Sequence, residues 1–234
     1  MPDTPSSAPQ NIDFSSVLAA AVHDMKNSLC LLIQSIEQLS ETLDPANTQA
    51  SNQVADVHYE ATRLNTSLVQ LLSLYRAQLD NLPITVDKCF IADLLEDVMG
   101  SVRLYKQRKA FSVEVECDEN LSWYLDSELL YLLINDALIN ALRYGQQRIK
   151  LSAFCDDGYL VIKVEDDGNG YPEPMLRQSQ TALADCVVSQ GRTGLGLFFA
   201  RLIANAHSQP DKTGSIALSN GGLYAGSVFE VKIP

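Results

Sequence analysis

The residues near the amino terminus that are best suited to chemistry are His23, Asp24 and Asn27. A neutral imidazole is a nucleophile with a proton to lose, so His23 could accept a transferred group covalently. Asp24 is its immediate neighbour, and Asn27 lies one helical turn further along the same face. His23 is therefore the candidate nucleophile of this chain.

A second set of reactive residues is spaced for one face of a helix. Asp136, Asn140 and either Arg143 or Tyr144 follow one another at intervals of four, three and one. A carboxylate, an amide and a guanidinium suit a magnesium-bound triphosphate, because Mg²⁺ keeps several waters and takes few protein ligands. This spacing predicts a binding face for such a ligand, with Asn140 as the metal ligand.

Two glycine-containing stretches add complementary chemistry. Asp166 precedes Gly168 and Gly170 at the end of an expected strand, where its carboxylate could accept a hydrogen bond from an exocyclic amine. That acceptor would favour adenine over guanine. The stretch 191–197, which includes Thr193, Gly194, Leu195, Gly196 and Leu197, opens an expected helix whose free N–H groups and dipole favour phosphate. Taken singly, each stretch could be an ordinary turn or a close helix contact.

Two long helices must position His23. In the first, from Ile12 to Leu43, apolar residues alternate spacings of four and three, as in a coiled coil, and His23 falls just outside this seam. The break at 44–47 is followed by a second helix with a similar seam. These patterns predict an antiparallel hairpin that forms a four-helix bundle in a homodimer.

The periodicity changes after 81–83, where strands and shorter helices alternate. We expect helices at 91–105, 127–144 and 194–206, strands at 111–117, 148–154, 159–165, 215–219 and 228–233, and a loop over 171–193. The predicted fold class is therefore α+β, a helical hairpin followed by an α/β sandwich with a mixed sheet. The expected organisation is a disordered tail over 1–11, a dimerisation and phosphotransfer domain over 12–82 and an ATP-binding domain over 83–234.

Composition narrows the function classes. The 234 residues carry a net charge of -12, which disfavours broad nucleic-acid or acidic-membrane surfaces. The five cysteines form no CxxC pair, as expected of reduced residues in a cytoplasmic protein. No apolar run approaches the roughly 20 residues that a membrane span requires.

Four blocks of the chain, in this order, resemble those of sensor histidine kinases of two-component systems. Their ATPase part is similar to that of gyrase, Hsp90 and MutL. The blocks are His23-Asp24-Met25-Lys26-Asn27-Ser28-Leu29, residues 136–144, Asp166-Asp167-Gly168-Asn169-Gly170 and Gly194-Leu195-Gly196-Leu197. The resemblance extends from about Phe14 to the carboxyl terminus.

The resemblance implies a cytoplasmic histidine kinase that uses ATP and Mg²⁺ to phosphorylate His23. The phosphoryl group would pass to an aspartate of a response-regulator receiver domain, and a separate protein would supply the sensory input. Asp24 would orient or accept the second imidazole proton, and Asn27 would position a water for hydrolysis of the regulator's phosphoaspartate. Asn140 would hold magnesium, Asp166 would read adenine, and Gly194 with Gly196 would close over the phosphates.

The chain departs from the family pattern at three places. Ser28 stands where proline is usual, so the helix is expected to lack a kink below His23. Asp136 replaces the commoner asparagine, and 171–193 has no clear phenylalanine motif. Two other functions fit the same blocks: a histidine phosphotransferase whose ATP-like domain only docks partners, and a nucleotide-switched scaffold.

Overall fold

The computed structural model describes residues 14–44, 47–80, 84–103, 111–180 and 194–234. The predicted tail and Thr193 lie outside the described residues. At His23, Gly194 and Leu195 the description covers the backbone and not the side chain. None of the described helices is long and apolar enough to cross a membrane.

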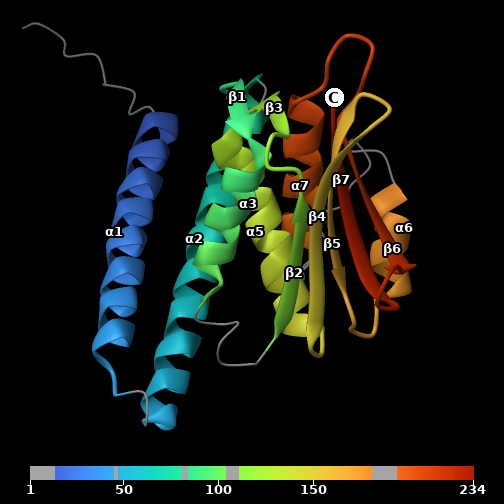
Figure 1. Ribbon diagram of the computed structural model, residues 1–234. Helices are drawn as coiled ribbons and strands as arrows, with labels where there is room; N and C mark the ends of the chain where they lie inside the picture. The colour runs from blue at the N-terminus through green and yellow to red at the C-terminus, as the bar shows by residue number, and fades with distance from the viewer. Residues whose placement is uncertain (1–13, 45–46, 81–83, 104–110, 181–193) are drawn as a thin grey trace, which may run out of the picture.

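The amino-terminal part is a helical hairpin of α1 (Phe14–Thr42) and α2 (Thr48–Asp80), which lie side by side (Figure 1). The Asn47 side chain accepts a hydrogen bond from the Ala50 N–H at 3.2 Å and so satisfies a free donor in the first turn of α2. Val22 and Ile36 of α1 are buried. The predicted hairpin is thus present, with α1 described from Phe14 and ending at Thr42 instead of Leu43.

Helix α1 continues unbroken through Ser28, where the family pattern has proline. The Ser28 hydroxyl donates to the carbonyl oxygen of Asp24, one turn earlier, at 3.0 Å. Because serine keeps its backbone N–H and has no ring to clash with that carbonyl, the helix does not have to break.

The remainder of the chain, from residue 84, is the α/β part. Its five-stranded sheet has the order β2-β4-β5-β7-β6, in which only β2 and β4 are parallel. The strands are β2 (Ser112–Cys117), β4 (Arg148–Asp156), β5 (Tyr159–Asp166), β6 (Ser215–Gly221) and β7 (Gly226–Ile233). The predicted mixed sheet is confirmed.

Three helices form the second layer of the α/β part. They are α3 (Ile91–Ser101), α5 (Ser127–Tyr144) and α7 (Gly194–Ala206), and they lie between the sheet and α2 (Figure 1). Leu138 of α5, Ile203 of α7 and Ile162 of β5 are almost fully buried in their shared core. Burial on this scale fixes the register of α5, the helix that carries Asp136 and Asn140.

Four elements differ from the sequence-based expectation. Strands β1 (Asp87–Phe90) and β3 (Ser122–Leu125) form a separate antiparallel pair, and their four-residue length leaves no clear alternation to detect. Helix α6 (Glu173–Gln180) lies within the stretch predicted as a loop, so that prediction was wrong there. The α6 helix is fixed by tertiary contacts, since Met175 and Leu176 pack against the core. Helix α3 ends at Ser101 instead of 105.

Candidate functional site

Asp166, the last residue of β5, is held by backbone donors. Its Oδ1 accepts hydrogen bonds from the N–H groups of Gly168 at 2.7 Å and Ser227 at 3.1 Å. The residue is only 4% exposed, and its Oδ2 forms no hydrogen bond with a described residue. One oxygen therefore fixes the carboxylate, and the other is left to accept a hydrogen bond from a ligand.

Glycines surround this carboxylate because no larger residue fits. A Cβ on Gly168 would meet the carbonyl oxygen of Tyr144, and one on Gly226 would come within 2.6 Å of Asp166 Oδ1. Gly170 has φ of +80°, a conformation that L-residues rarely adopt, and a Cβ there would press on Asn220. The glycines predicted to flank Asp166 thus allow the backbone to approach it.

Asp167 has a structural role, because its carboxylate accepts hydrogen bonds from the backbone. Its Oδ1 accepts hydrogen bonds from the N–H groups of Gln146 at 2.8 Å and Gln147 at 3.0 Å, just after α5. Burial raises the pKa of Asp167, but hydrogen bonds from the N–H groups of Gln147, Gln146 and Arg148 outweigh it and the net pKa is lowered. Asp167 therefore fastens the Asp166 turn to the end of α5.

Asp136 and Asn140 lie one turn apart on α5, as their spacing predicted. The Asn140 amide donates to Asp136 Oδ2 at 3.5 Å, which leaves the amide oxygen for another partner. Burial raises the pKa of Asp136 to about 6, and the contact with Asn140 only partly opposes this. Asp136 is thus a carboxylate whose negative charge the fold does not fully compensate.

Arg143 and Tyr144 occupy the last turn of α5 and contact each other. The Arg143 guanidinium lies 5.2 Å from the centre of the Tyr144 ring, and the Tyr144 side chain is mostly exposed. The Tyr144 backbone, through its close approach to Gly168, borders the Asp166 turn. A ligand-binding role for these two side chains stays a prediction.

Tyr171, which no motif of the sequence indicates, lies near both Asp136 and Asp166. Burial raises its pKa, and the charges of Asp166 and then Asp136 raise it further, so its phenol lies within electrostatic reach of both. Its backbone N–H donates to Asn220 Oδ1 at 2.6 Å, and Asn220 Nδ2 donates back to the Tyr171 carbonyl at 3.0 Å. The three side chains Asp136, Asp166 and Tyr171 therefore share one region.

The glycine block at the start of α7 approaches this region from another helix. At the opposite end of α7, His207 Nε2 accepts a hydrogen bond from the Asp126 N–H, at the start of α5, at 2.9 Å. The two helices therefore run antiparallel, and Gly194 lies toward the end of α5 that carries Asn140. Gly196 is half-buried and Leu197 is in the core, while Thr193 is outside the described residues.

The donor set suits a magnesium ion held jointly with a ligand. Among the described residues, no group of three or more histidine, cysteine, aspartate or glutamate side chains could enclose a metal. Asn140 offers an amide oxygen and Asp136 an undercompensated carboxylate, and Mg²⁺ commonly takes one or two such ligands plus phosphates and water. These residues therefore fit a metal that arrives with a phosphate ligand.

The block that contains His23 lies far from this region. His23 is in the first third of α1, and at about 1.5 Å per residue it stands roughly 28 Å along the axis from Thr42. The carboxyl end of α5 lies at the end of the molecule where α1 stops, and α1 begins at the other (Figure 1). Asp24 and Asn27 are exposed. The structure thus brings together Asp136, Asn140 and Asp166, and not His23.

Comparison with known proteins bears directly on these motifs. The family model described as "Histidine kinase-, DNA gyrase B-, and HSP90-like ATPase" matches residues 125–234. Over 93% of its length the chain is 25% identical to the sensor histidine kinase SpaK of Bacillus subtilis, and it covers 47% of that protein. It is 26% identical to CssS of Bacillus subtilis (strain 168), with 82% of this chain and 43% of the relative covered.

The chain is similar to sensor histidine kinases over most of its length, and its carboxyl-terminal half matches the ATPase family model. The sequence-based resemblance is thereby confirmed, and the chain spans less than half the length of those curated proteins. Among solved structures, the Acinetobacter baumannii histidine kinase AdeS matches with a TM-score of 0.58 and 20% identity, over 90% of this chain and 96% of that one.

A structure of full-length ShkA in complex with AMPPNP matches this chain with a TM-score of 0.62 and 19% identity, over 94% of this chain and 46% of the ShkA chain. At these identities the structural matches show that the fold is shared.

Proposed function

We propose that this chain is an ATP-dependent histidine kinase that phosphorylates His23 and then donates the phosphoryl group to an aspartate of a response-regulator receiver domain. The observation that carries the proposal is the fixed Asp166 carboxylate, with one oxygen free beside Asp136 and Tyr171. A rigid acceptor in a glycine-flanked turn suits the exocyclic amine of adenine. The sensor histidine kinase relatives support the remaining steps by analogy.

In this mechanism the residues of the α/β part bind and orient the nucleotide. Asp166 Oδ2 would accept a hydrogen bond from the adenine amine, Asn140 with Asp136 would hold the magnesium ion, and the amino end of α7 would face the phosphates. Bound magnesium would neutralise charge on the β- and γ-phosphates. A cation beside Asp136 would also stabilise its ionised form, whose charge the fold leaves undercompensated.

His23 supplies the nucleophile. One ring nitrogen forms the new bond to the γ-phosphorus as the bond to the β-phosphate oxygen breaks and ADP leaves. The proton on the other nitrogen can pass to Asp24 or be held by it, which requires the Asp24 side chain to swing round, because adjacent helix positions do not face each other. Asn27, one turn away, would orient a water when the regulator's phosphoaspartate is hydrolysed.

Transfer also requires the α/β part to move relative to the hairpin. In the described arrangement the carboxyl end of α5, near the proposed nucleotide site, lies at the end of the molecule where α1 stops (Figure 1). His23 lies near the other end of α1. Phosphoryl transfer needs reacting atoms about 3 to 3.5 Å apart. We infer that the described arrangement is a resting one, and that the α/β part leaves α2 before it reaches His23 of the same or a partner chain. A cytoplasmic location and a sensory input from another protein stay predictions.

Labelling with γ-labelled ATP and magnesium tests the proposal. Wild type should acquire acid-labile, base-stable label, and His23→Gln should acquire none while it still binds nucleotide. Asp166→Asn should instead weaken ATP binding, because the amide presents a donor or a neutral oxygen where a carboxylate accepted the amine. Label retained in His23→Gln would refute the assignment of His23. Failure of wild type to bind ATP would favour a phosphotransferase with a docking-only domain.

A further inference from the structure

Asn220 and Ser227 lie opposite each other near the end of the β6–β7 ladder, beside the turn that begins at Asp166. The Ser227 backbone N–H donates to Asp166 Oδ1 at 3.1 Å. The Asn220 side chain contacts the other end of the same turn, at Tyr171. One cross-strand pair therefore holds both ends of the stretch 166–171, which contains the glycines of the proposed nucleotide site.

The Asn220 amide forms two hydrogen bonds with a single residue. Its Oδ1 accepts from the Tyr171 backbone N–H at 2.6 Å, and its Nδ2 donates to the Tyr171 carbonyl oxygen at 3.0 Å. These bonds satisfy the backbone donor and the backbone acceptor of one residue, as a neighbouring strand would. Because two bonds restrict direction as well as distance, the contact sets the orientation of the Tyr171 backbone.

Gly170 makes room for this contact. Its φ is +80°, and a Cβ at this position would lie 2.8 Å from both Cγ and Oδ1 of Asn220. The Asn220 amide can therefore reach the Tyr171 backbone only because residue 170 has no side chain. The hydrogen bonds and the close packing are separate observations, and both place the amide against this part of the turn.

The Tyr171 ring borders the proposed nucleotide site. It is partly buried and packs against the core of the α/β part. Burial raises the pKa of Tyr171, and the charges of Asp166 and then Asp136 raise it further, so the phenol lies near both carboxylates. In the proposed function Asp166 reads adenine and Asp136 helps to hold magnesium. The ring therefore lies where its orientation affects the fit of the nucleotide.

The contact contributes little to the stability of the fold. Asn220 is exposed, so its side chain adds nothing to the buried core. Its two hydrogen bonds are also exposed, and water can replace the amide as a partner of the Tyr171 backbone in a variant. What water cannot replace is the fixed orientation that the amide imposes.

We propose that Asn220 is a positioning residue of the nucleotide site, which acts by fixing Tyr171 beside Asp136 and Asp166. This role rests on the proposed function. In the protein without ligand the stretch 166–171 already has the arrangement that binds nucleotide. Without the Asn220 amide, nucleotide binding has to order this stretch, so the affinity falls while the transfer from bound nucleotide to His23 is unchanged.

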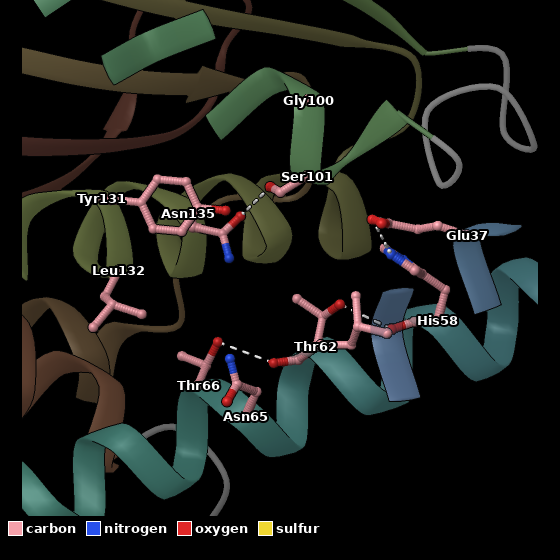
Figure 2. Close-up of a pocket in the computed structure, with 11 residues that line it drawn as sticks. Glu37, His58, Thr62, Asn65, Thr66, Gly100, Ser101, Tyr131, Leu132 and Asn135 are labelled. Atoms are coloured by element: carbon pink, nitrogen blue, oxygen red, sulfur yellow. Dashed lines mark hydrogen bonds and ion pairs between the residues drawn. The ribbon is translucent and has the colours of Figure 1, made fainter. Parts of the chain in front are cut away.

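Asn220 lies away from the contact between the hairpin and the α/β part. In Figure 1, β6 is on the side of the α/β part that faces away from α2. A cavity of about 290 Å³ marks the contact itself and is lined by residues of α1, α2, α3 and α5 (Figure 2). A change at Asn220 should therefore leave the docking intact, and its effect on labelling does not come from release of the α/β part.

Titration with AMPPNP and magnesium, together with labelling of His23 over a range of ATP concentrations, tests Asn220→Ala. We expect the Kd for AMPPNP and the half-saturating ATP concentration to rise about five- to tenfold, as for the ordering of one residue. The maximal labelling rate and the urea midpoint should not change. A partly misfolded variant would instead lose label without a change in the half-saturating ATP concentration.

The outcomes separate this assignment from the proposed function. Equal affinity of Asn220→Ala and wild type for AMPPNP would overturn the positioning role and leave the proposed function intact. A wild type that binds no nucleotide would overturn both. Asn205→Ala is the matched control, because it removes an exposed asparagine amide in the last turn of α7. It should bind AMPPNP like wild type.

A double-mutant cycle tests whether Asn220 acts through Tyr171. Tyr171→Ala removes the ring and keeps the backbone groups that the amide contacts. It should weaken AMPPNP binding, and adding Asn220→Ala should then weaken it by less than about twofold further, because the ring that the amide positions is gone. Losses that multiply in full, or wild-type affinity in Tyr171→Ala, would overturn the assignment.

Discussion

At the scale of single residues, adjacent carboxylates differ in function because their surroundings differ. Asp166 uses one oxygen on backbone N–H groups and keeps the other available, whereas Asp167 accepts hydrogen bonds with both oxygens just after α5. Asp136 has only a 3.5 Å contact with Asn140, so burial dominates and its pKa is about 6. Identical side chains thus differ in how far the fold satisfies them: Asp167 is fully held, Asp166 is held through one oxygen, and Asp136 is buried with little compensation.

The raised pKa of Asp136 predicts a pH dependence of stability. The pKa of this carboxyl rises from its ordinary value of 3.8, which applies in the unfolded chain, to about 6 in the folded protein. Its contribution to stability is therefore fully present below about 3.8 and lost as the pH rises through about 6. Without nucleotide, Asp136→Asn should be more stable than wild type at pH 8, by roughly 1 to 3 kcal/mol, with a smaller difference at about pH 4.5. Urea unfolding across this pH range measures it.

The control for that measurement is Asp157→Asn in the exposed β4–β5 turn, where φ is +49° and asparagine is tolerated. It should show no such pH-dependent gain. A constant difference in the free energy of unfolding between Asp136→Asn and wild type at every pH would mean that burial does not raise the pKa of Asp136.

The sequence identified the residues proposed to bind nucleotide better than the residues that hold them in place. Asp166 and Gly168 could be identified because their spacing is local. Tyr171, Asn220 and Ser227 could not, because their contacts join β5 and the following turn to β6 and β7, 49 to 61 residues away. Nothing in a local pattern encodes such pairings.

At the scale of elements, hydrogen bonds to the Asp126 side chain hold the amino end of α5 in position. Asp126 Oδ1 accepts from the Leu129 N–H at 3.0 Å, and Oδ2 accepts from the Thr85 N–H at 2.8 Å, in the segment between the hairpin and the α/β part. Because Asp126→Ala removes a helix cap and leaves these donors unsatisfied, it should lower the free energy of unfolding by about 2 to 4 kcal/mol.

Chemical denaturation checks this value, with Glu119→Ala in the exposed β2–β3 turn as the control, expected within about 0.5 kcal/mol of wild type. Asp126→Asn, which can still accept at Oδ1, should lose less than the alanine variant. Equal losses in the two would mean that the cap does not matter.

Helix α5 itself was predictable from its apolar periodicity, whereas β1, β3 and α6 depend on tertiary contacts.

At the scale of the whole molecule, the hairpin exposes apolar side chains that a second copy could cover. Leu32, Leu39, Val57 and Leu64 are each about half exposed, on the seams that predicted a four-helix bundle. We expect a homodimer, and Leu32→Glu with Leu64→Glu should shift it to monomer in sedimentation-velocity experiments. Leu223→Glu, at an exposed apolar residue in the β6–β7 turn, is the control and should stay dimeric.

The last prediction concerns the docking of the α/β part on α2, because in the proposed mechanism the α/β part must leave α2 before His23 is phosphorylated. Tyr59 of α2 packs against the core of the α/β part. Tyr59→Ala removes that apolar contact, so the docked arrangement should weaken by about 1 to 2 kcal/mol. The variant should then label His23 roughly 5- to 30-fold faster, and its radius of gyration by small-angle scattering should increase. Asn52→Ala, at an exposed position of α2, should match wild type. Slower labelling in an expanded Tyr59→Ala would show instead that docking on α2 assists the transfer.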